Sequence, residues 1–226
     1  MLLKIQILWL MLRMALKPGD ILLIEKIRKA LSKAGMFKDS VQYIERDPEA
    51  RKTLLERPLL PADWLDLAYL RSLNEDTFGH QFARFVDKHQ LDPHFSVDAD
   101  MNSMEGYLHR RIPQIHDMLH VVLGQETDPL GELHLQAFLL AQVLWPMAPF
   151  LIGGWLLREM FRDLSQVPSV MSVISEGWRL GKIAKPLFAV TWETQWERPM
   201  DELRASLGLE GAGLDRLPMT IKTAAL

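Results

Sequence analysis

The chain has 226 residues, of which 48% are hydrophobic and 24% charged, and its 13 Gly and 13 Pro are near average usage, which excludes collagen-like, low-complexity and disordered proteins. Leu, Ala and Met outnumber Val, Ile and Thr by more than two to one, and this balance favours helices over sheets. The absence of Cys excludes disulfides, thiolate zinc sites and cysteine nucleophiles, and a net charge of -3 argues against nucleic acid as a partner.

The N-terminal segment, residues 1–17, is almost entirely apolar and is expected to be helical. It lies in a basic region, because residues 1–35 hold seven Lys or Arg against two acids. Arg13 interrupts the apolar run and no small-residue cleavage site follows, which argues against a secretory signal, and the run is short for a membrane span. Two interpretations stay open: a helix packed in the core or at a dimer interface, and a helix lying on a membrane surface.

Apolar periodicity predicts further helices along the first half of the chain. The second helix covers residues 20–34, with Asp20 as its N-cap. The others are expected between Asp47 and Arg57, from about Leu60 to Leu73, and from Phe78 to about His89. Residues 92–102 turn polar, and only there does the pattern leave room for a few residues of strand.

A long uncharged run dominates the second half. Residues 101–123 predict a helix interrupted by Pro113, and after a Gly-containing loop residues 133–157 carry no formal charge. That length raises the possibility of a membrane span. Two prolines, Gly153–Gly154 and two glutamines favour instead two buried helices that meet at a bend near Pro146, and such a segment could also line an apolar cavity.

The remaining residues predict two helices and a tail. One helix covers Ser165 to Leu180 and ends before Gly181, and the last covers residues 187–207 with Trp192 and Trp196 one turn apart. We therefore expect an all-α, single-domain helical bundle over residues 18–209, with the apolar helix 1–17 before it and a loose tail at 210–226.

One constellation carries chemistry. His116, Asp117 and His120 lie in the segment IHDMLH, and because a helix turns by about 100° per residue the three side chains project into one sector. Imidazoles at i and i+4 can share one metal ion, as in the H-E-x-x-H helix. An antiparallel helix pair would bring Glu132 back beside the two histidines. His116, Asp117, His120 and Glu132 are therefore the candidate metal ligands and catalytic residues.

The donor set does not select one metal. Imidazole and carboxylate ligands suit a divalent Zn, Fe, Mn, Co or Mg ion, with water or a substrate carboxylate in an open position. The competing interpretation is that the two histidines are partly exposed helical residues and Asp117 a solvated charge.

Other signals are weaker. Arg179, Lys182 and Lys185 recur every three residues and could bind an anionic head group, but a solvated basic helix end is the simpler interpretation. We interpret Trp178, Trp192 and Trp196 as core or interface aromatics and His134 as a buried polar residue with satisfied hydrogen bonds. His80, His89, His94 and His109 have no partner pattern, and the chain has no nucleotide-binding loop or nucleophile elbow.

The motif H-D-x-x-H followed after eleven residues by E resembles the metal motif of the ubiquinone (coenzyme Q) biosynthesis protein 4 family. The resemblance extends from about residue 45 to 209 and includes Thr77-Phe78-Gly79, Tyr107, Arg111, Gly131, Ala184-Lys185-Pro186-Leu187, Trp192-Glu193 and Arg198-Pro199. The chain departs from the pattern at Pro113 and Gln114, where the family usually has an Arg and a Glu, which puts a salt bridge at that position in doubt.

This resemblance implies a helical, peripheral membrane protein that binds polyprenylated quinone precursors beside a metal ion. It implies either oxidative decarboxylation of a polyprenyl hydroxybenzoate, with water or dioxygen supplying the new hydroxyl, or a non-catalytic lipid-binding scaffold that organises other quinone-biosynthesis enzymes. A His-Asp phosphohydrolase would need further His and Asp ligands, which no pattern in the sequence locates. We expect residues 133–157 to form one wall of a prenyl-chain tunnel, with Gly153–Gly154 leaving room for the ligand.

The expected partners are a polyprenyl lipid, a membrane surface and other enzymes of the pathway, with a homodimer as a further possibility. The expected location is the cytoplasmic face of a membrane, or an organellar inner membrane in a eukaryote, with the basic residues near the N-terminus attracted to anionic lipid.

Overall fold

The computed structural model describes residues 2–16, 20–60, 64–94 and 99–212. Its helices in chain order are α1 (Leu2–Leu16), α2 (Ile21–Lys33), α3 (Met36–Ile44), α4 (Pro48–Glu56), α5 (Leu67–Ser72), α6 (Phe78–His89), α7 (Met104–Leu123), α8 (Pro129–Val143), α9 (Met147–Arg162), α10 (Val167–Ile183) and α11 (Met200–Ser206), with short 3₁₀ turns η1 (Leu164–Gln166), η2 (Leu187–Ala189) and η3 (Trp192–Thr194). Within the described ranges there is no strand, only an isolated bridge between Thr77 and Pro199. The predicted all-α, single-domain fold is confirmed.

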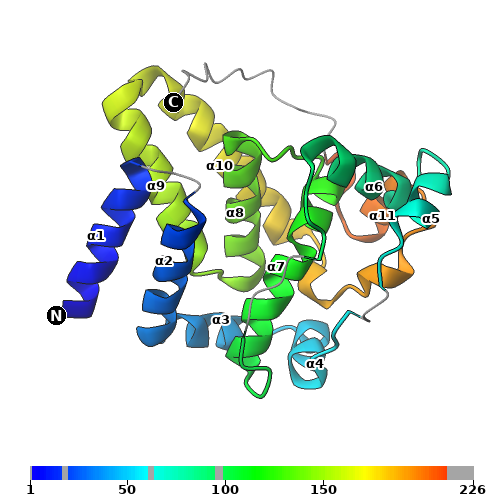
Figure 1. The fold of residues 1–226 in the computed structure, drawn as a ribbon, viewed down its shortest axis with the longest axis horizontal. Helices are drawn as coiled ribbons and strands as arrows, with labels where there is room; N and C mark the ends of the chain where they lie inside the picture. Colours follow the sequence, from blue (N-terminus) through cyan, green and yellow to red (C-terminus); the bar gives the residue numbers. More distant parts are fainter. Residues whose placement is uncertain (1, 17–19, 61–63, 95–98, 213–226) are drawn as a thin grey trace.

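Helix α8 occupies the middle of the molecule (Figure 1). Helices α1, α2 and α9 lie on one side of it, and α5, α6 and α11 lie beyond α7 on the other, with α3 and α4 across one end. A single hydrophobic cluster joins these elements, from Leu10 on α1 through Phe138 on α8 to Leu203 on α11. Continuous burial of this kind is what makes the helices one folding unit.

Short polar side chains fix where the helices begin. Asp20, Asp47, Thr77, Ser103 and Asp128 each accept a hydrogen bond from a backbone N–H in the first turn of the helix that follows. Each such cap satisfies a donor that the helix itself cannot, and is worth about 1 kcal/mol. The predicted starts of α2, α4 and α6 are confirmed.

The uncharged run divides into α8 and α9. Leu144, between them, has a left-handed backbone with φ of 49°, and Trp145 and Pro146 complete the bend. Helix α8 is buried on nearly all sides and packs tightly on α10, where a Cβ on Gly177 would lie 2.2 Å from the His134 carbonyl oxygen. No helix among the described residues is both long enough and apolar enough to cross a membrane.

The predicted last helix over residues 187–207 is wrong. The chain forms η2 and η3, then a turn that ends at Pro199, and only then the short α11. The backbone N–H groups of Phe78 and Gly79 donate to the carbonyls of Arg198 and Trp196. These carbonyls are therefore used by α6 rather than by a helix of their own, and Pro199 disfavours helical geometry at the residue before it. Trp192 and Trp196 are nevertheless buried core aromatics, as expected, whereas Trp178 is 44% exposed.

Smaller corrections concern helix extents. Helix α7 runs through Pro113 without interruption, because Ile112 and Ile115 beside it are buried and this packing outweighs the lost hydrogen bond. Helix α10 continues past Gly181 to Ile183. Helix α3 was not predicted from the sequence pattern. The helix expected from Leu60 is confined to α5, and residues 61–63 lie outside the described residues.

Helix α1 packs against α9 and α2 with one of its two apolar sides. Leu10, Met14 and Ala15 are buried there. The space above Gly153 and Gly154 is taken by α1, since a Cβ on Gly153 would lie 2.5 Å from Met11 Cε and one on Gly154 would lie 3.4 Å from Met14 Cγ. The room that these glycines leave is thus occupied by flexible methionines.

Candidate metal site

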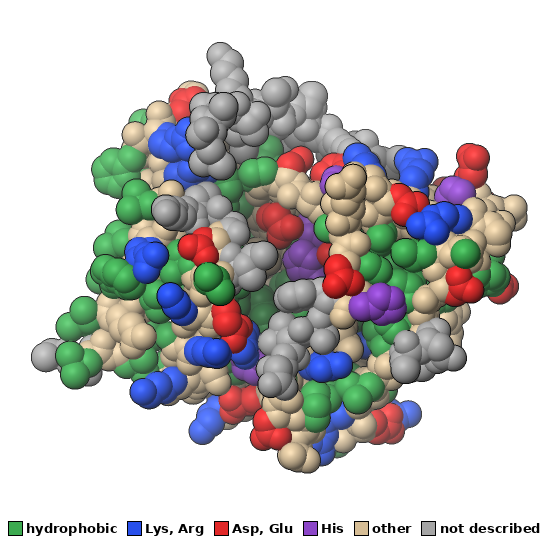
Figure 2. All heavy atoms as spheres, viewed as in Figure 1, with side chains coloured by type: hydrophobic (Ala, Val, Ile, Leu, Met, Phe, Trp, Pro, Cys, Tyr) green, Lys and Arg blue, Asp and Glu red, His purple; other side chains and the backbone are tan. Residues whose placement is uncertain are grey.

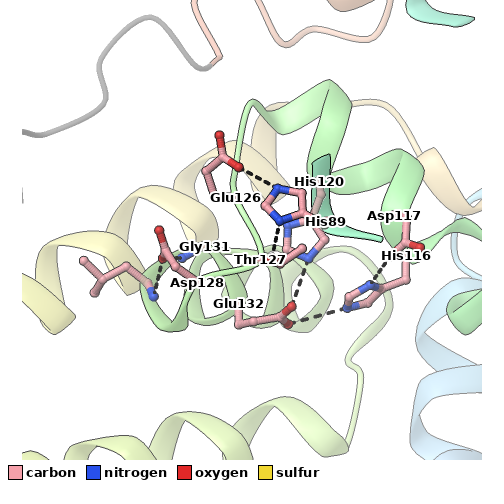
Figure 3. A network of polar contacts seen from close by, with 10 residues as sticks. His89, His116, Asp117, His120, Glu126, Thr127, Asp128, Gly131 and Glu132 are labelled. Atoms are coloured by element: carbon pink, nitrogen blue, oxygen red, sulfur yellow. Dashed lines mark hydrogen bonds and ion pairs between the residues drawn. The ribbon is translucent and has the colours of Figure 1, made fainter. Parts of the chain in front are cut away.

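The last turns of α7 and the first turn of α8 bring together His116, His120 and Glu132 (Figure 3). Helix α8 turns back from the end of α7, so Glu132 faces both imidazoles: His116 Nε2 lies 3.6 Å from Glu132 Oε2, and His120 Nε2 lies 3.2 Å from Glu132 Oε1. One ligand atom from each residue falls within 4.8 Å of the others. The i, i+4 spacing and the helix reversal predicted from the sequence thus produce one compact donor cluster.

Asp117 occupies a different position from the one expected. Its Oδ1 lies 3.1 Å from His116 Nδ1, on the side of the ring opposite Glu132. Carboxylates that bind the second nitrogen of a ligand histidine fix its tautomer and orientation and raise its basicity. The geometry therefore gives Asp117 the role of orienting His116, while His116, His120 and Glu132 form the converging set.

His120 is fully buried, and neither of its ring nitrogens has hydrogen-bond geometry with a described residue, although Nε2 lies at ion-pair distance, 3.2 Å, from Glu132 Oε1. Its ring stacks on Phe85 of α6, with centroids 5.8 Å apart, and meets His116 edge-on at 4.8 Å. A buried imidazole without hydrogen bonds is costly. The cost is relieved if a cation joins His120 to the carboxylate that faces it.

Charge complementarity within the cluster is strong. Desolvation by itself would lower the pKa of His116, but its hydrogen bonds and charge interactions with Asp117 and Glu132 outweigh this effect and raise the pKa to about 10. Burial opposes ionisation of Glu132, yet the two imidazoles hold its pKa well below its usual range. The site thus stabilises a positive charge between its ligands, carried by a proton or by a metal ion.

The spacing of the donors fits a divalent ion. Two ligands that each lie about 2.1 Å from a tetrahedral ion are about 3.4 Å apart; the two histidine-to-carboxylate distances, to different oxygens of Glu132, are 3.6 and 3.2 Å, and the donor atoms as a set lie within 4.8 Å of one another. Two imidazoles and one carboxylate are also the ligand set of several catalytic zinc sites, which keep a fourth position open. The residues present therefore fit a divalent metal.

The cluster is accessible from one face. The side chains of His116, Asp117 and Glu132 are 28–36% exposed, and Figure 2 shows a hollow near the middle of the viewed face where histidine and acidic side chains lie among hydrophobic ones. A pocket of about 170 Å³ at the end of α7 is lined in part by Arg84, Phe85, Lys88, His120 and Gln125. The partial exposure of His116, Asp117 and Glu132 gives these side chains access to a ligand from solvent.

The other candidate residues lie elsewhere. The ring of His109 packs against Phe37 in a tilted arrangement, with centroids 3.9 Å apart, and Arg28 Nη1 lies 3.3 Å from its Nδ1. Burial, followed by the charge of Arg28, lowers the pKa of His109 to about 4. His134 is buried on the α10 side of α8, and neither ring nitrogen has a hydrogen-bond partner among the described residues, so the expectation of a satisfied polar residue is wrong.

Two basic residues of α10 have protein partners in the described structure. Arg179 pairs with Glu176, and Lys182 Nζ lies 3.4 Å from Tyr43 Oη. The solvated helix end that the sequence favoured agrees with these contacts.

Sequence reasoning missed a second polar group beside the site. His89, at the end of α6, contacts Glu126 and Thr127 in the loop between α7 and α8. Its ring also packs on Phe85, at 4.7 Å. No local pattern signals this arrangement, because the partners are 37 and 38 residues apart in the sequence.

Several residues that carried the family resemblance hold the fold around the site. Tyr107 donates its hydroxyl to the Pro58 carbonyl, and Arg111 donates to the Val190 carbonyl from a buried position. Gly79 and Gly131 allow close backbone approach, because a Cβ on Gly131 would lie 1.9 Å from the Glu126 carbonyl oxygen. These residues therefore position α7 and α8 rather than join the donor cluster.

The fold and the site define a class: an all-helical protein that presents two histidines and a glutamate from a pair of reversing helices. Comparison with known families is specific. A family model described as coenzyme Q (ubiquinone) biosynthesis protein Coq4 matches residues 14–212. The chain belongs to this family, which acts in ubiquinone biosynthesis.

Relatives and a solved structure agree. The chain is 32% identical over 164 residues to ubiquinone biosynthesis protein COQ4 homolog 1, mitochondrial, of Culex quinquefasciatus, covering 72% of this chain and 58% of that protein. It is 33% identical over 173 residues to the Bos taurus COQ4 homolog, also named mitochondrial, covering 74% and 63%. The chain thus spans about three fifths of the length of these relatives. A crystal structure of a putative ubiquinone biosynthesis protein from Nostoc punctiforme superposes with a TM-score of 0.79 at 28% identity, covering 90% of this chain and 96% of that one.

Proposed function

We propose that this protein binds a polyprenylated precursor of ubiquinone with its head group at a divalent metal ion held by His116, His120 and Glu132, and that it promotes oxidative decarboxylation of a polyprenyl hydroxybenzoate. The observation that carries the metal assignment is the fully buried His120, whose ring nitrogens lack hydrogen bonds while Nε2 lies 3.2 Å from Glu132. Family membership supplies the pathway.

Each residue has a defined part in this proposal. A divalent ion bound there would act as a Lewis acid toward the carboxylate and the neighbouring phenol oxygen of the head group. His116 and His120 supply neutral nitrogen ligands, Glu132 supplies an anionic one, and Asp117 holds the His116 ring so that Nε2 faces the site. Phe85 covers one face of His120 and keeps water from it.

The apolar part of the ligand has support in the surroundings of the site. Glu132 lies in the first turn of α8, most of whose following residues are apolar and buried, and Phe150, Leu151 and Ile152 of α9 are only partly buried. Burying a chain of about twenty prenyl carbons would contribute on the order of 10 kcal/mol before the costs of association. Retention of such a lipid therefore needs few specific contacts to the ring.

We further propose that α1 rests on an anionic membrane surface. Its outward side exposes Leu2, Ile5, Leu8, Trp9, Leu12 and Leu16. No acidic residue lies in α1, and Lys4 is exposed beside the apolar stripe. An apolar helix face bordered by basic residues is typical of helices that lie in the membrane interface. A location on a membrane surface also suits a lipid ligand.

Purification followed by mass spectrometry, with the protein kept native, tests the main proposal. We expect about one divalent ion and one polyprenyl lipid per chain in the wild-type protein, and release of carbon dioxide from a polyprenyl hydroxybenzoate in the presence of the metal and dioxygen. Lipid and metal retention without turnover would instead support the scaffold. Absence of metal after supplementation with zinc, iron or manganese would refute the metal assignment.

A further inference from the structure

A polar network joins α6 to the loop that precedes Glu132 (Figure 3). His89 Nε2 lies 2.8 Å from Glu126 Oε2, and His89 Nδ1 lies 3.0 Å from Thr127 Oγ1. Lys88 Nζ lies 2.8 Å from the same Glu126 oxygen. The side chains of His89 and Glu126 are only 17% and 24% exposed. The contact between these two side chains is therefore shielded from solvent more than an ordinary surface ion pair is.

The donors and acceptors of this network match. A neutral imidazole donates from one nitrogen and accepts at the other. When His89 Nε2–H donates to the Glu126 carboxylate, Nδ1 is left to accept the hydroxyl hydrogen of Thr127. One ring thus holds two adjacent loop residues at once, and we call His89, Glu126 and Thr127 the His89 clamp.

The held loop leads directly to a metal-site residue. Gly124 ends α7 with a left-handed backbone, and Asp128 already caps α8 by accepting from the Gly131 N–H. Gly131 also packs so closely on the Glu126 carbonyl oxygen that a Cβ there would lie at 1.9 Å. The position of Glu126 and Thr127 therefore sets the position of the first turn of α8, and Glu132 is in that turn.

We propose that the His89 clamp is a positioning device for the metal site: it holds the loop before α8 so that Glu132 meets His116 and His120. This inference rests on the proposed metal function. A site that is competent for only part of the time binds its ligand more weakly in proportion to that fraction. Releasing the loop should therefore weaken metal binding even though no ligand is changed.

The test uses near-isosteric substitutions in the full chain. Thr127→Val removes the hydroxyl that donates a hydrogen bond to His89, whereas Thr127→Ser retains this hydroxyl. Affinity for Co²⁺ is measured by titration of visible absorbance, and for Zn²⁺ by competition. We expect the Co²⁺ dissociation constant to rise about tenfold in T127V and to stay within about twofold of wild type in T127S.

Asp87→Asn provides the matched control. It breaks the ion pair with Arg71, which joins the same helix α6 to α5 away from the loop. We expect thermal unfolding of metal-free D87N and T127V to be similar while only T127V loses affinity. Equal metal affinity in T127V and wild type, or an equal loss in D87N, would overturn the clamp and leave the metal site itself intact. Wild-type protein that binds no Co²⁺ or Zn²⁺ would overturn both proposals.

Hydrogen exchange of the metal-free protein gives a readout that is independent of binding. The backbone N–H groups of Gly131 and Glu132 donate to Asp128 in the described structure. We expect these amides to exchange several-fold faster in T127V and at the wild-type rate in T127S and D87N. Unchanged exchange in T127V would show that the loop does not depend on the clamp.

Discussion

At the scale of single residues, the proposed metal site separates the candidate ligands from the carboxylate that would orient one of them. The buried Nε2 of His120 faces Glu132, whereas Asp117 faces the far nitrogen of His116. The distinction has a measurable consequence, because loss of a ligand removes a metal bond and loss of an orienting carboxylate only weakens one.

We therefore expect His120→Ala to abolish stoichiometric metal binding and Asp117→Ala to weaken it by about 10- to 100-fold without abolishing it. Metal content after dialysis against a range of free Zn²⁺ concentrations distinguishes the two results. His109→Ala, on the same helix but away from the cluster, serves as the control. Equal losses in D117A and H120A would make Asp117 a ligand.

Because two histidines are buried, we expect the free energy of unfolding to depend on pH. Burial is the largest cause that lowers the pKa of His134 and of His109 to about 4 from 6.5. As the pH falls, these histidines take up protons in the unfolded chain before they do so in the folded protein. The stability that comes from keeping them neutral is therefore fully present above pH 6.5 and is lost as the pH falls from 6.5 toward 4. Each histidine accounts for at most about 3 kcal/mol of this decrease in the free energy of unfolding.

Urea denaturation at several pH values checks this dependence. His134→Leu should reduce the decrease in the free energy of unfolding between pH 6.5 and 4, while His94→Leu at an exposed position should leave it at the wild-type value. A decrease of the wild-type size in H134L would show that His134 does not remain neutral in the folded protein.

At the scale of elements, the close contact of α8 and α10 depends on glycine. A Cβ on Gly177 would lie 2.2 Å from the His134 carbonyl oxygen, whereas one on Gly154 of α9 would meet atoms only at 3.4 Å or beyond. Both glycines are buried within helices. The same substitution should therefore have opposite effects at the two positions.

We expect Gly177→Ala to destabilise the protein by about 1–3 kcal/mol, because two backbones must separate. Gly154→Ala should be neutral or stabilising by up to about 1 kcal/mol, because alanine favours the helix more than glycine does. Chemical denaturation of both variants measures the difference. If G177A were as stable as G154A, α8 and α10 would not be in backbone contact.

The exposed side of α1 supports a second prediction at this scale. Replacing Leu8 and Leu12 with Gln should weaken binding to anionic liposomes by more than fivefold without loss of stability, since both side chains are exposed. Binding of the wild-type protein should fall as salt is raised.

Leu55 and Leu59 supply the control, because both are about half exposed and lie away from α1. Their replacement with Gln should leave liposome sedimentation unchanged. Equal sedimentation of the wild-type and the L8Q/L12Q proteins would exclude α1 as the membrane contact.

At the scale of the whole molecule, the proposed metal site would be tied to global stability, because its candidate ligands come from two helices of one continuous core. A ligand that binds only the folded state stabilises it by about 2.7 kcal/mol at a concentration of 100 times its dissociation constant. We expect Zn²⁺ to raise the thermal midpoint of the wild-type protein by several degrees and EDTA to reverse the change. No rise should occur in H120A, and a rise of equal size there would place the stabilising ion elsewhere.

Features that depend on near neighbours could be read from the sequence. The helix starts at Asp20, Asp47 and Thr77 follow from side chains that cap the next turn. The pairing of His116 with His120 follows from the helical repeat, and the return of Glu132 follows from the short loop between two helices. In each case the interacting groups lie within a few turns of one another, so helical periodicity and loop length determine them.

Features that depend on distant partners required the tertiary structure. The segment 187–199 loses its predicted helix because its carbonyls bind α6, more than a hundred residues earlier. Asp117 was expected to be a ligand, but its orienting position depends on the side-chain torsions that packing allows, and the contact of His89 with the loop before Glu132 depends on how α6 lies against α7. Hydrogen bonds and packing between remote segments compete with local propensity, and their energies become known only when the fold brings the partners together.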